Sequence, residues 1–550
     1  MAQGPAWGDQ PCRHKRAPDT ELQKGRPCRL GPLLSMAELA RAPASRPASP
    51  RAAPELEGSG TFAPLKHEDG PIFSGFKQDI APYVAECVGT FLLTLTFLLN
   101  YSDAANANYH ALANAFMNMV LKCCFGHVSG ANLNPSLTIS MFLAGRLKFR
   151  TAAKIILAQV LGACCAGSVR FSIGNANVLI GPNPGHTWRQ VAFVEIMYTS
   201  LLCFVFLNTA ASTRNNPRDD QNGFYGVAIG LVFIAGSCAG MSICHAMLNS
   251  AVAIGFTIVD FRERGVLRLA GPGYLFHDLA GAFLGTWFYR LVRPGEFDPV
   301  ALQMGELDET PGREAANRVT AEFLGAFYIV LTKALNRADV THFEPWSMTA
   351  VIAAMAYSVR DVSGAYFNPA VTASVVLSRR GILSVRTAVW DVLTQLFAGA
   401  IATALCESVH PSTLTIRFAE SSAAKIAFGE MFFTGFVCYG VLTTSTVMPV
   451  ACKTKRNNIA GLVYGGSHMV GCVAASQLSG SLLNPVVALS FAALAGREGC
   501  LDYIFFELAG AVGATAVFFL THVHLYTGDK AAEAGDRRLP GAGERGTFEA

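Results

Sequence analysis

Gly-Ala-Asn-Leu-Asn-Pro-Ser, at residues 130–136, occurs in this chain in four versions. The others are Gly-Ala-Tyr-Phe-Asn-Pro-Ala at 364–370, Met-Leu-Asn-Ser-Ala at 247–251 and Leu-Leu-Asn-Pro-Val at 482–486. An Asn side chain caps the first turn of a helix, and Pro suits the first helical position, where its missing N–H would be unpaired anyway. The pattern therefore predicts four helices that begin inside apolar segments. Their first residues are Asn134, Pro135 and Ser136; Asn249, Ser250 and Ala251; Asn368, Pro369 and Ala370; and Asn484, Pro485 and Val486.

Two further landmarks accompany every motif in the same order. An acidic residue inside an apolar segment precedes the motif, and its interval to the motif Asn is alternately short and long; these acids are Glu86, Glu195, Glu322 and Glu430. A polar residue ahead of small residues follows the motif, at Gln159, Asp278, Gln395 and Glu507. The chain is therefore either one unit written four times or a two-repeat domain written twice, and such periodicity fixes the architecture.

The composition is that of a membrane protein. Of the 550 residues, 51% are hydrophobic and 15% are charged, whereas soluble domains carry about 25% charged residues. Since a spanning helix needs ~20 mostly apolar residues, we expect an all-α membrane protein with about six transmembrane helices in each half. The expected spans are 80–100, 104–126, 151–173, 190–211, 224–241 and 274–292, then 318–336, 345–359, 385–407, 423–446, 459–476 and 502–524. The motif segments are too short to span, which favours two re-entrant half-helices in each half.

Polar segments divide the chain into five parts. We expect a disordered cytosolic tail at 1–76, a first membrane domain at 77–295, an acidic linker at 296–315, a second membrane domain at 316–527 and a disordered tail at 528–550. The N-terminal tail is rich in Pro, Arg and Ala, which is typical of a solvated segment, and a transit peptide is the alternative. The 15 Cys show no metal spacing. We expect buried thiols rather than disulfides, and no metal, cofactor or nucleic-acid partner.

The placement of basic residues predicts the orientation, whereas the net charge of +4 says little. Four basic loops fall on one side of the membrane, and the positive-inside rule makes that side cytoplasmic. Their residues are Arg146, Lys148, Arg150, Arg214, Arg218, Arg379, Arg380, Arg386, Lys453, Lys455 and Arg456. The multi-pass protein then has both termini in the cytosol. Arg262, Arg264 and Arg268 fall on the other side and oppose this orientation; plasma and intracellular membranes both remain open.

An odd number of spans, about three, precedes the point where the pattern begins again within each half. The two repeats must therefore enter the membrane in opposite directions, so that their half-helices meet near the midplane. Asn134 would then lie beside Asn249, and Asn368 beside Asn484, with the positive ends of two helix dipoles at the same point. Such a site opposes cations and admits neutral hydrogen-bonding molecules. The buried acids are expected to accept hydrogen bonds from the non-helical backbone, a proton relay being the functional alternative.

These residues resemble the aquaporin (major intrinsic protein) family, present twice. The resemblance rests on Ala-Glu-Cys-Val-Gly-Thr-Phe at 85–91, Gly-His-Val-Ser-Gly-Ala-Asn-Leu-Asn-Pro at 126–135 and Ala-Gln-Val-Leu-Gly-Ala at 158–163. In the second half it rests on 321–327, 362–370 and 479–485, and overall it covers roughly 78–293 and 316–525. It implies a passive channel for water and small neutral solutes in the lipid membrane, with two pores per chain. Because family members are similar in forming tetramers of single-pore subunits, two chains would give a four-pore pseudo-tetramer.

The chain departs from the family at the outer constriction of the pore. The family's Arg, three places after the second motif Asn, is replaced by Val252 and Val487. By the family's offsets the other filter positions are Asn114, Ser237 and Ala246 in the first copy, and Met348, Cys472 and Ser481 in the second. We expect a wider, less positive filter that passes glycerol, urea, ammonia or hydrogen peroxide, and two pores that are not equivalent.

Three further expectations follow. Ser250 stands where the other motifs have Pro, and the half-helix should survive this change. His127 and Asp361 occupy matching places, where a His either gates with pH or is a hydrogen-bonded vestibule residue. The rivals to a channel are a poorly conducting structural or adhesion protein on the same fold, and an ion-coupled transporter, which would need charged coupling sites. No nucleophile–base set is visible, so an enzyme is not expected.

Overall fold

The structure is a computed structural model. It describes residues 80–101, 109–174, 180–216, 222–265, 270–298, 310–338, 342–410, 422–447, 459–495 and 500–526. The predicted tails therefore lie outside the described residues, as do most of the predicted linker and the basic residues Arg218, Arg268, Lys453, Lys455 and Arg456. The described parts contain helices and no strands.

The first half contains six longer helices and two that begin at a motif. They are α1 (Ala81–Tyr101), α2 (His110–Ser129), α3 (Pro135–Leu143), α4 (Phe149–Ile173), α5 (Trp188–Phe206) with its π-helical extension η2 (Leu207–Ala211), α6 (Tyr225–Gly240), α7 (Ser250–Arg264) and α8 (Ala270–Val292). The short η3 (Pro294–Phe297) follows. The motif helices α3 and α7 start at residues 135 and 250, directly after the motif Asn, as the capping argument predicts.

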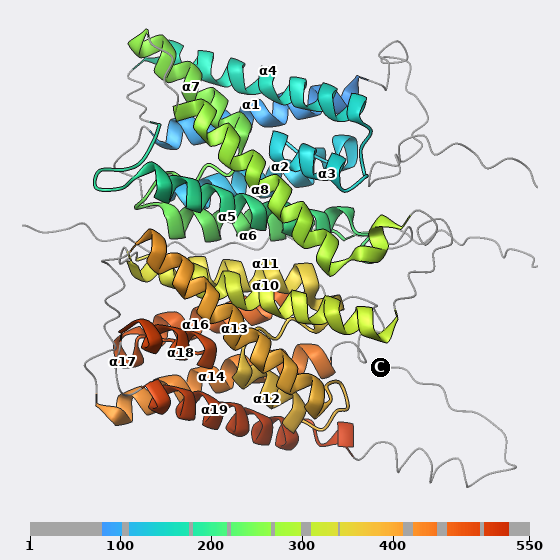
Figure 1. Ribbon diagram of the computed structural model, residues 1–550, viewed down its shortest axis with the longest axis vertical. Coiled ribbons are helices and arrows are strands. Elements are labelled where there is room, and N and C mark those ends of the chain that lie inside the picture. Colours follow the sequence, from blue (N-terminus) through green and yellow to red (C-terminus); the bar gives the residue numbers. More distant parts are fainter. Residues whose placement is uncertain are drawn as a thin grey trace, which may run out of the picture. The chain divides into compact units, whose positions relative to one another are not determined.

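The second half repeats this order (Figure 1). Its helices are α10 (Pro311–Ala338), α11 (Glu344–Ser363), α12 (Pro369–Leu377), α13 (Val385–Val409), α14 (Ala423–Thr446), α16 (Ala460–Ala474) with the short α17 (Ser476–Ser479), α18 (Pro485–Ala495) and α19 (Cys500–Thr521). Helix α10 begins a few residues before the predicted domain start at 316. The all-α fold with two equivalent halves is therefore confirmed.

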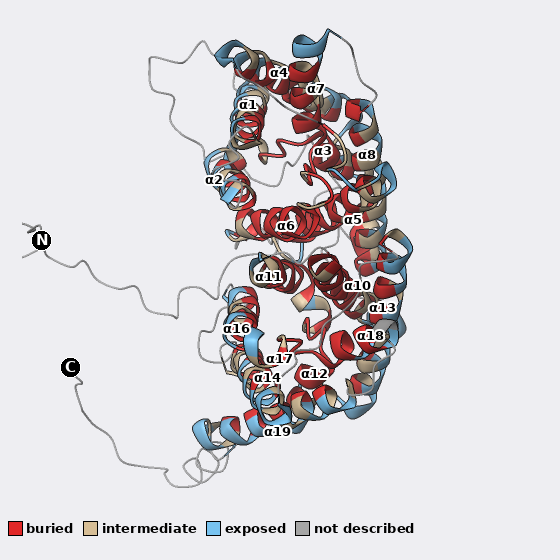
Figure 2. Ribbon diagram, turned by 90° about the vertical axis from the view of Figure 1, so that its left-hand side faces the viewer, coloured by how far each residue is buried: buried red, intermediate tan, exposed pale blue. Residues whose placement is uncertain are grey.

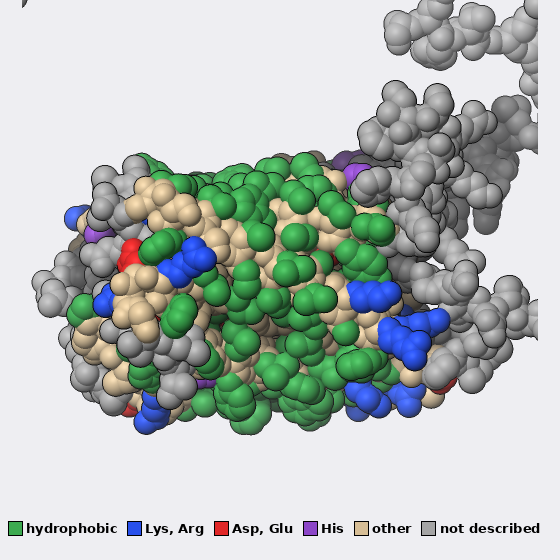
Figure 3. All heavy atoms as spheres, turned by 90° about the horizontal axis from the view of Figure 1, so that it is seen from above, with side chains coloured by type: hydrophobic (Ala, Val, Ile, Leu, Met, Phe, Trp, Pro, Cys, Tyr) green, Lys and Arg blue, Asp and Glu red, His purple; other side chains and the backbone are tan. Residues whose placement is uncertain are grey.

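Within the described residues, six helices are long and apolar enough to cross a membrane by length and composition alone. They are Ala81–Tyr101, Phe149–Ile173, Trp188–Ala211, Val385–Val409, Ala423–Thr446 and Cys500–Thr521. The remaining long helices carry more charge or are shorter; α6, for example, has 16 residues. Apolar side chains form a broad band across the middle of the face in Figure 3, with basic side chains toward both ends. Leu157 and Leu161 of α4 are among the exposed apolar residues of this half.

The two halves share an interior made by α5 and α6 on one side and α10 and α11 on the other (Figure 2). Hydroxyl groups join them: Tyr198 and Thr332 lie 2.9 Å apart, and Ser200 and Tyr328 lie 2.6 Å apart. The Ser347 hydroxyl donates to a carbonyl oxygen of α6 at 2.8 Å. Because polar groups in an apolar interior need partners, these bonds specify how the two halves pack.

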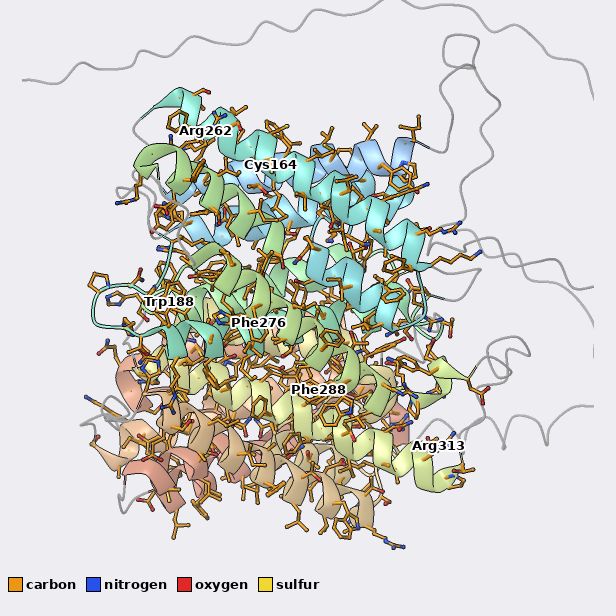
Figure 4. All side chains as sticks on the ribbon, turned by 45° about the horizontal axis from the view of Figure 1, so that its top comes forward. Cys164, Trp188, Arg262, Phe276, Phe288 and Arg313 are labelled. Atoms are coloured by element: carbon orange, nitrogen blue, oxygen red, sulfur yellow. The ribbon has the colours of Figure 1, made fainter. Side chains whose placement is uncertain are left out.

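The ends of the helices carry the charged residues that set the two membrane faces. Figure 4 shows Arg262, near the end of α7, and Arg313, at the start of α10, at opposite ends of the helices. Between these ends, Phe276 and Phe288 lie along α8, and Cys164 lies on α4 (Figure 4).

Candidate channel sites at the four half-helix starts

A buried carboxylate holds the non-helical segment ahead of α3. Glu86 is fully buried and accepts hydrogen bonds from the backbone N–H groups of Asn132 (2.8 Å) and Leu133 (2.7 Å). The Ser129 hydroxyl and the Gln159 amide also donate to it, each at 2.8 Å. Each carboxylate oxygen of Glu86 thus accepts two hydrogen bonds, and a buried carboxylate needs such donors to replace water.

The same arrangement recurs ahead of the other three half-helices. Glu195 accepts from the N–H groups of Met247 and Leu248 at 2.8 and 2.9 Å. Glu322 accepts from Tyr366 and Phe367 at 3.0 and 2.8 Å, and Glu430 accepts from Leu482 and Leu483 at 3.0 and 2.7 Å. These contacts match the structural role expected for the four acids. In each case the carboxylate accepts two successive backbone N–H groups.

The paired N–H groups are aligned by an unusual backbone. Each non-helical segment has two non-glycine residues at positive φ, with a single residue between them. The pairs are Ala131 and Leu133, Ala246 and Leu248, Ala365 and Phe367, and Ser481 and Leu483. A left-handed non-glycine residue costs about 1–2 kcal/mol. The strain persists because it directs successive N–H groups at one carboxylate, and its recurrence at four sites confirms that the four segments are built alike.

The motif asparagines meet in pairs, one pair in each half. The Asn134 amide donates to the carbonyl oxygen of Leu248 at 2.8 Å, and the Asn249 amide donates back to that of Leu133 at 2.9 Å. In the second half Asn368 donates to Leu483 at 2.9 Å and Asn484 to Phe367 at 3.2 Å. Each Asn also caps its own helix, its side-chain oxygen accepting the N–H two residues on, at 2.9–3.0 Å. Two helix N-termini therefore meet head to head inside each half.

Comparison with protein families finds a match to Major intrinsic protein, over residues 76–289 and again over 334–520. The chain belongs to this family. Nodulin-26 of Glycine max is 30% identical over 243 residues, which are 42% of this chain and 84% of the relative. Probable aquaporin NIP7-1 of Arabidopsis thaliana is 27% identical (43% and 89%), and Aquaporin-5 of Botryotinia fuckeliana 25% identical (45% and 70%). Less than half of this chain thus covers most of each relative, and the two matched segments make the chain a tandem duplication.

Family membership and the apolar helices make the chain a multi-pass integral membrane protein of a channel family. The resemblance stated from the sequence is thereby confirmed.

The filter positions inferred from the family are buried and differ between the halves. Asn114 accepts a hydrogen bond from Asn100 at 2.7 Å, while Ser237, Ala246 and Val252 lie in the interior of the first half. In the second half the Ser481 hydroxyl donates to the carbonyl oxygen of Cys472 at 3.2 Å. The Cys472 thiol lies 3.1 Å from Nδ1 of His468. Met348 and Val487 are fully buried.

Ser250, which replaces the motif Pro, belongs to a hydroxyl chain. Its hydroxyl donates to Oδ2 of Asp278 at 3.2 Å and lies 2.8 Å from the Ser136 hydroxyl. Thr199 donates to the other Asp278 oxygen at 3.0 Å. Helix α7 starts normally at residue 250, so the half-helix survives the loss of Pro as expected. Pro has no hydroxyl group, so the hydrogen bond to Asp278 is one that only the serine can make at this position.

Two lysines that sequence reasoning passed over are buried at the sites. Lys122 of α2 is 1% exposed and donates to the carbonyl oxygens of Ala131 and, at 3.0 Å, Asn132. Lys333 of α10 is fully buried and donates to the carbonyl oxygen of Ser481 at 2.8 Å. Both lie inside spans predicted from hydropathy. An ionisable residue in a spanning segment is itself a signal of function. Both lysines could therefore have been singled out from the sequence. In the second half Lys333, which is paired with Glu344, contacts the backbone of Ser481, one of the expected filter residues.

The matched positions 127 and 361 have different surroundings. His127 is exposed, whereas the Asp361 carboxylate binds both terminal nitrogens of Arg293 at 2.7 and 2.8 Å. Arg293 is almost fully buried and also donates to Asn208 at 2.6 Å. Asp361 therefore joins the end of the first half to α11 of the second, and it has a structural role rather than a vestibule role.

Proposed function

We propose that the chain is a passive membrane channel with two pores, one in each half, for water and small neutral solutes such as glycerol, urea, ammonia and hydrogen peroxide. The observation that carries the proposal is the reciprocal contact of the two motif asparagines in each half. Non-helical backbone is tolerated at membrane depth only where it is buried in protein or lines a water-filled cavity. A pair of opposed helix starts supplies donors and a positive potential at one point.

This arrangement selects by charge and by hydrogen bonding. A cation that approaches the two helix N-termini meets like potential and loses its hydration, whereas a neutral solute exchanges hydrogen bonds with water for bonds with the protein. The buried acids take N–H groups of each non-helical segment, and the carbonyl oxygens that neither a motif Asn nor a lysine holds would be the solute acceptors. The chemistry favours solutes that both donate and accept.

We propose that the two pores differ in solute preference. The first filter would consist of Asn114, Ser237, Ala246 and Val252, which are small and polar or aliphatic. The second would consist of Met348, Cys472, Ser481 and Val487, with a thiol and a thioether. The absence of Arg from both filter positions favours solutes larger than water, and the sulfur groups make the second filter the more apolar.

Stopped-flow light scattering of proteoliposomes tests the proposal. Under a sucrose gradient we expect faster shrinkage than in empty liposomes, and under a glycerol gradient faster re-swelling. Val252→Trp and Val487→Trp, each used only as monodisperse protein, should narrow one pore at a time. Equal losses from the two variants for every solute would contradict inequivalent pores. Absence of flux above empty liposomes, from folded protein, would favour the poorly conducting structural or adhesion role, for which the two lysine contacts to backbone are the supporting observation.

We also propose that two chains associate into a four-pore assembly in the lipid membrane. The contact of α5 and α6 with α10 and α11 is internal to the chain, and the matching helices α1, α2, α14 and α16 keep exposed apolar side chains. These include Val84, Val88, Leu92, Phe116, Val120, Phe428, Phe432, Phe436, Val470 and Val473. A second copy would cover these faces by repeating the internal contact. Light scattering in nanodiscs separates one chain from two, and a single chain per nanodisc at all loadings would contradict the assembly.

The remaining proposals concern organisation. We propose domain boundaries at 77–295 and 316–527, joined by the linker and flanked by cytosolic tails at 1–76 and 528–550. Protease protection of epitopes placed in each tail, in sealed cells, tests the orientation. Cleavage of either tail from outside would reverse it.

A further inference from the structure

The buried acids fix which way the peptide groups of the non-helical segments point. In a trans peptide the N–H and the C=O point in opposite directions. The N–H groups of Asn132 and Leu133 point at Glu86, so the carbonyl oxygens of Ala131 and Asn132 point away from it. By the same reasoning the N–H of Leu482 points at Glu430, and the carbonyl oxygen of Ser481 points away. These oxygens lie on the side away from the acids, where the proposed pore would run.

Lys122 occupies those oxygens in the first half. Its ammonium donates to the carbonyl oxygens of Ala131 and Asn132, the two that are turned away from Glu86. The ammonium also lies 5.1 Å from the centre of the Phe206 ring, which adds a cation–π contact. A carboxylate and an ammonium thus lie on opposite sides of the same two peptide groups. Their polarisation strengthens both sets of hydrogen bonds.

Lys333 does the same at the second motif of the second half. Its ammonium donates to the carbonyl oxygen of Ser481 and is paired with Glu344, the first residue of α11. One helical turn further on, Arg337 donates to the carbonyl oxygen of Gly480 and also contacts Glu344. Two successive carbonyl oxygens of this segment are therefore held by cations that come from α10.

The lysines are not repeated between the halves. Ala356 stands as far before Asn368 as Lys122 stands before Asn134, and Phe97 stands as far after Glu86 as Lys333 stands after Glu322. Among the described residues, each half therefore has one buried lysine bonded to motif backbone, at its first motif in the first half and at its second motif in the second half. A cation that merely stabilised this fold would be needed at every matching site, and the fold forms at the two sites without it.

We propose that Lys122 and Lys333 limit permeation, each closing one end of one pore by occupying the carbonyl oxygens that a passing solute needs. This rests on the proposed channel function. A solute in single file must exchange its hydrogen bonds at every step. Where an ammonium holds the acceptors, the solute must displace a charge-assisted hydrogen bond to pass. A wild-type channel of this kind is slow, and its rate is set by the two lysines rather than by the missing filter Arg.

The test is osmotic water flux in proteoliposomes of the full chain, compared at equal protein loading. Lys122→Ala and Lys333→Ala should each raise the flux through its own pore about tenfold, the rate gain when one charge-assisted hydrogen bond is removed from the barrier, and so raise the total flux of two equal pores about fivefold. The double variant should give the sum of both gains. Lys122→Arg keeps the charge and should give a lower flux than Lys122→Ala. Lys154→Ala removes an exposed lysine of α4 and should match the wild type.

Lys122→Ala places in the first half the residue that the second half already has, so folding is expected. If it fails to purify as monodisperse protein, Ala356→Lys in the Lys333→Ala background is the second variant, and it should lower the flux that Lys333→Ala has gained. Equal flux from the wild type and from every lysine variant would overturn the inference and leave the channel function intact. No flux of water, glycerol or urea from any variant, the double variant included, would overturn the channel function itself.

Discussion

Replacing Ser250 by Pro would make the motif at residues 249–251 look like the other three, and we expect it to destabilise the protein. The local backbone accepts Pro. Asn249 is extended, with φ −152° and ψ 109°, and residue 250 is the first of α7, where the N–H has no partner within the helix. Compatible Pro substitutions stabilise by about 0.4–1 kcal/mol through the unfolded chain.

The loss is larger than this gain. The Ser250 hydroxyl donates to Asp278 and is 2.8 Å from Ser136, and all three side chains are buried. A hydrogen bond to a polar partner contributes about 1 kcal/mol, one to a charged partner about 1.5 kcal/mol or more, and a buried acceptor left without its donor adds a desolvation cost. Two lost bonds therefore remove about 2.5 kcal/mol. With the gain from Pro the net loss is about 2 kcal/mol.

The assay is thermal unfolding of purified protein in one detergent, with Ser250→Ala and Pro369→Ser as comparisons. Ser250→Ala loses both bonds without the gain from Pro, so the order of stability should be wild type, Ser250→Pro, Ser250→Ala. Pro369→Ser reverses the change in a repeat that has Gln395 rather than an acid after its motif, and should cost only about 0.4–1 kcal/mol. A Ser250→Pro variant that melts at or above the wild type would refute the role given to the hydroxyl chain.

Three further changes test other parts of the structure. Asp361→Asn removes the negative charge that pairs with Arg293, and should lower the free energy of unfolding by about 2 kcal/mol. This is below the range for a fully buried pair because the Asp361 side chain is 32% exposed. An unchanged midpoint would contradict this. Gly510→Ala would put a methyl group 2.3 Å from a carbonyl oxygen of α14 and should cost about 1–3 kcal/mol, whereas Gly513→Ala meets nothing within 4 Å and should be neutral. Equal effects of the two would contradict the close packing. If Cys472 lines the second pore, mercurials should lower the flux and Cys472→Ser should prevent it; block that persists in the variant would exclude the assigned filter position.

The architecture was open to prediction because it is written in local patterns that recur. The four Asn caps, the four acids and the apolar spans each have a physical reason that does not depend on distant contacts. Asn134 could therefore be paired with Asn249 from the count of spans alone, and Glu86 could be assigned to the non-helical backbone. The observed helix bounds differ from the predicted spans by only a few residues at most ends, which is where helix assignment is least determinate.

The contacts that distinguish the two halves were not open to prediction in the same way. Whether Lys122 reaches the carbonyl oxygen of Ala131 depends on the direction of its side chain on α2. A hydropathy average over an apolar window does not reveal a single lysine within it. Asp361 was noted only as the position that matches His127. Its partner Arg293 lies far from it in the predicted order of spans, and the two meet only because the halves pack against each other. Long-range pairs of this kind follow from tertiary packing.

The divergence between the halves is concentrated around the half-helix starts. The acids and the motif Asn are present at all four sites, so the folding requirement is met equally. The residues around them are not the same: Ser250 against Pro485, Lys122 against Ala356, and His245 against Gly480, which has φ 79°. Two pores kept for capacity alone would have no reason to differ there. We therefore expect the lysines on the carbonyl side to act on permeation and the Ser250 hydroxyl to act on stability, so that the two halves respond separately to substitutions at these positions.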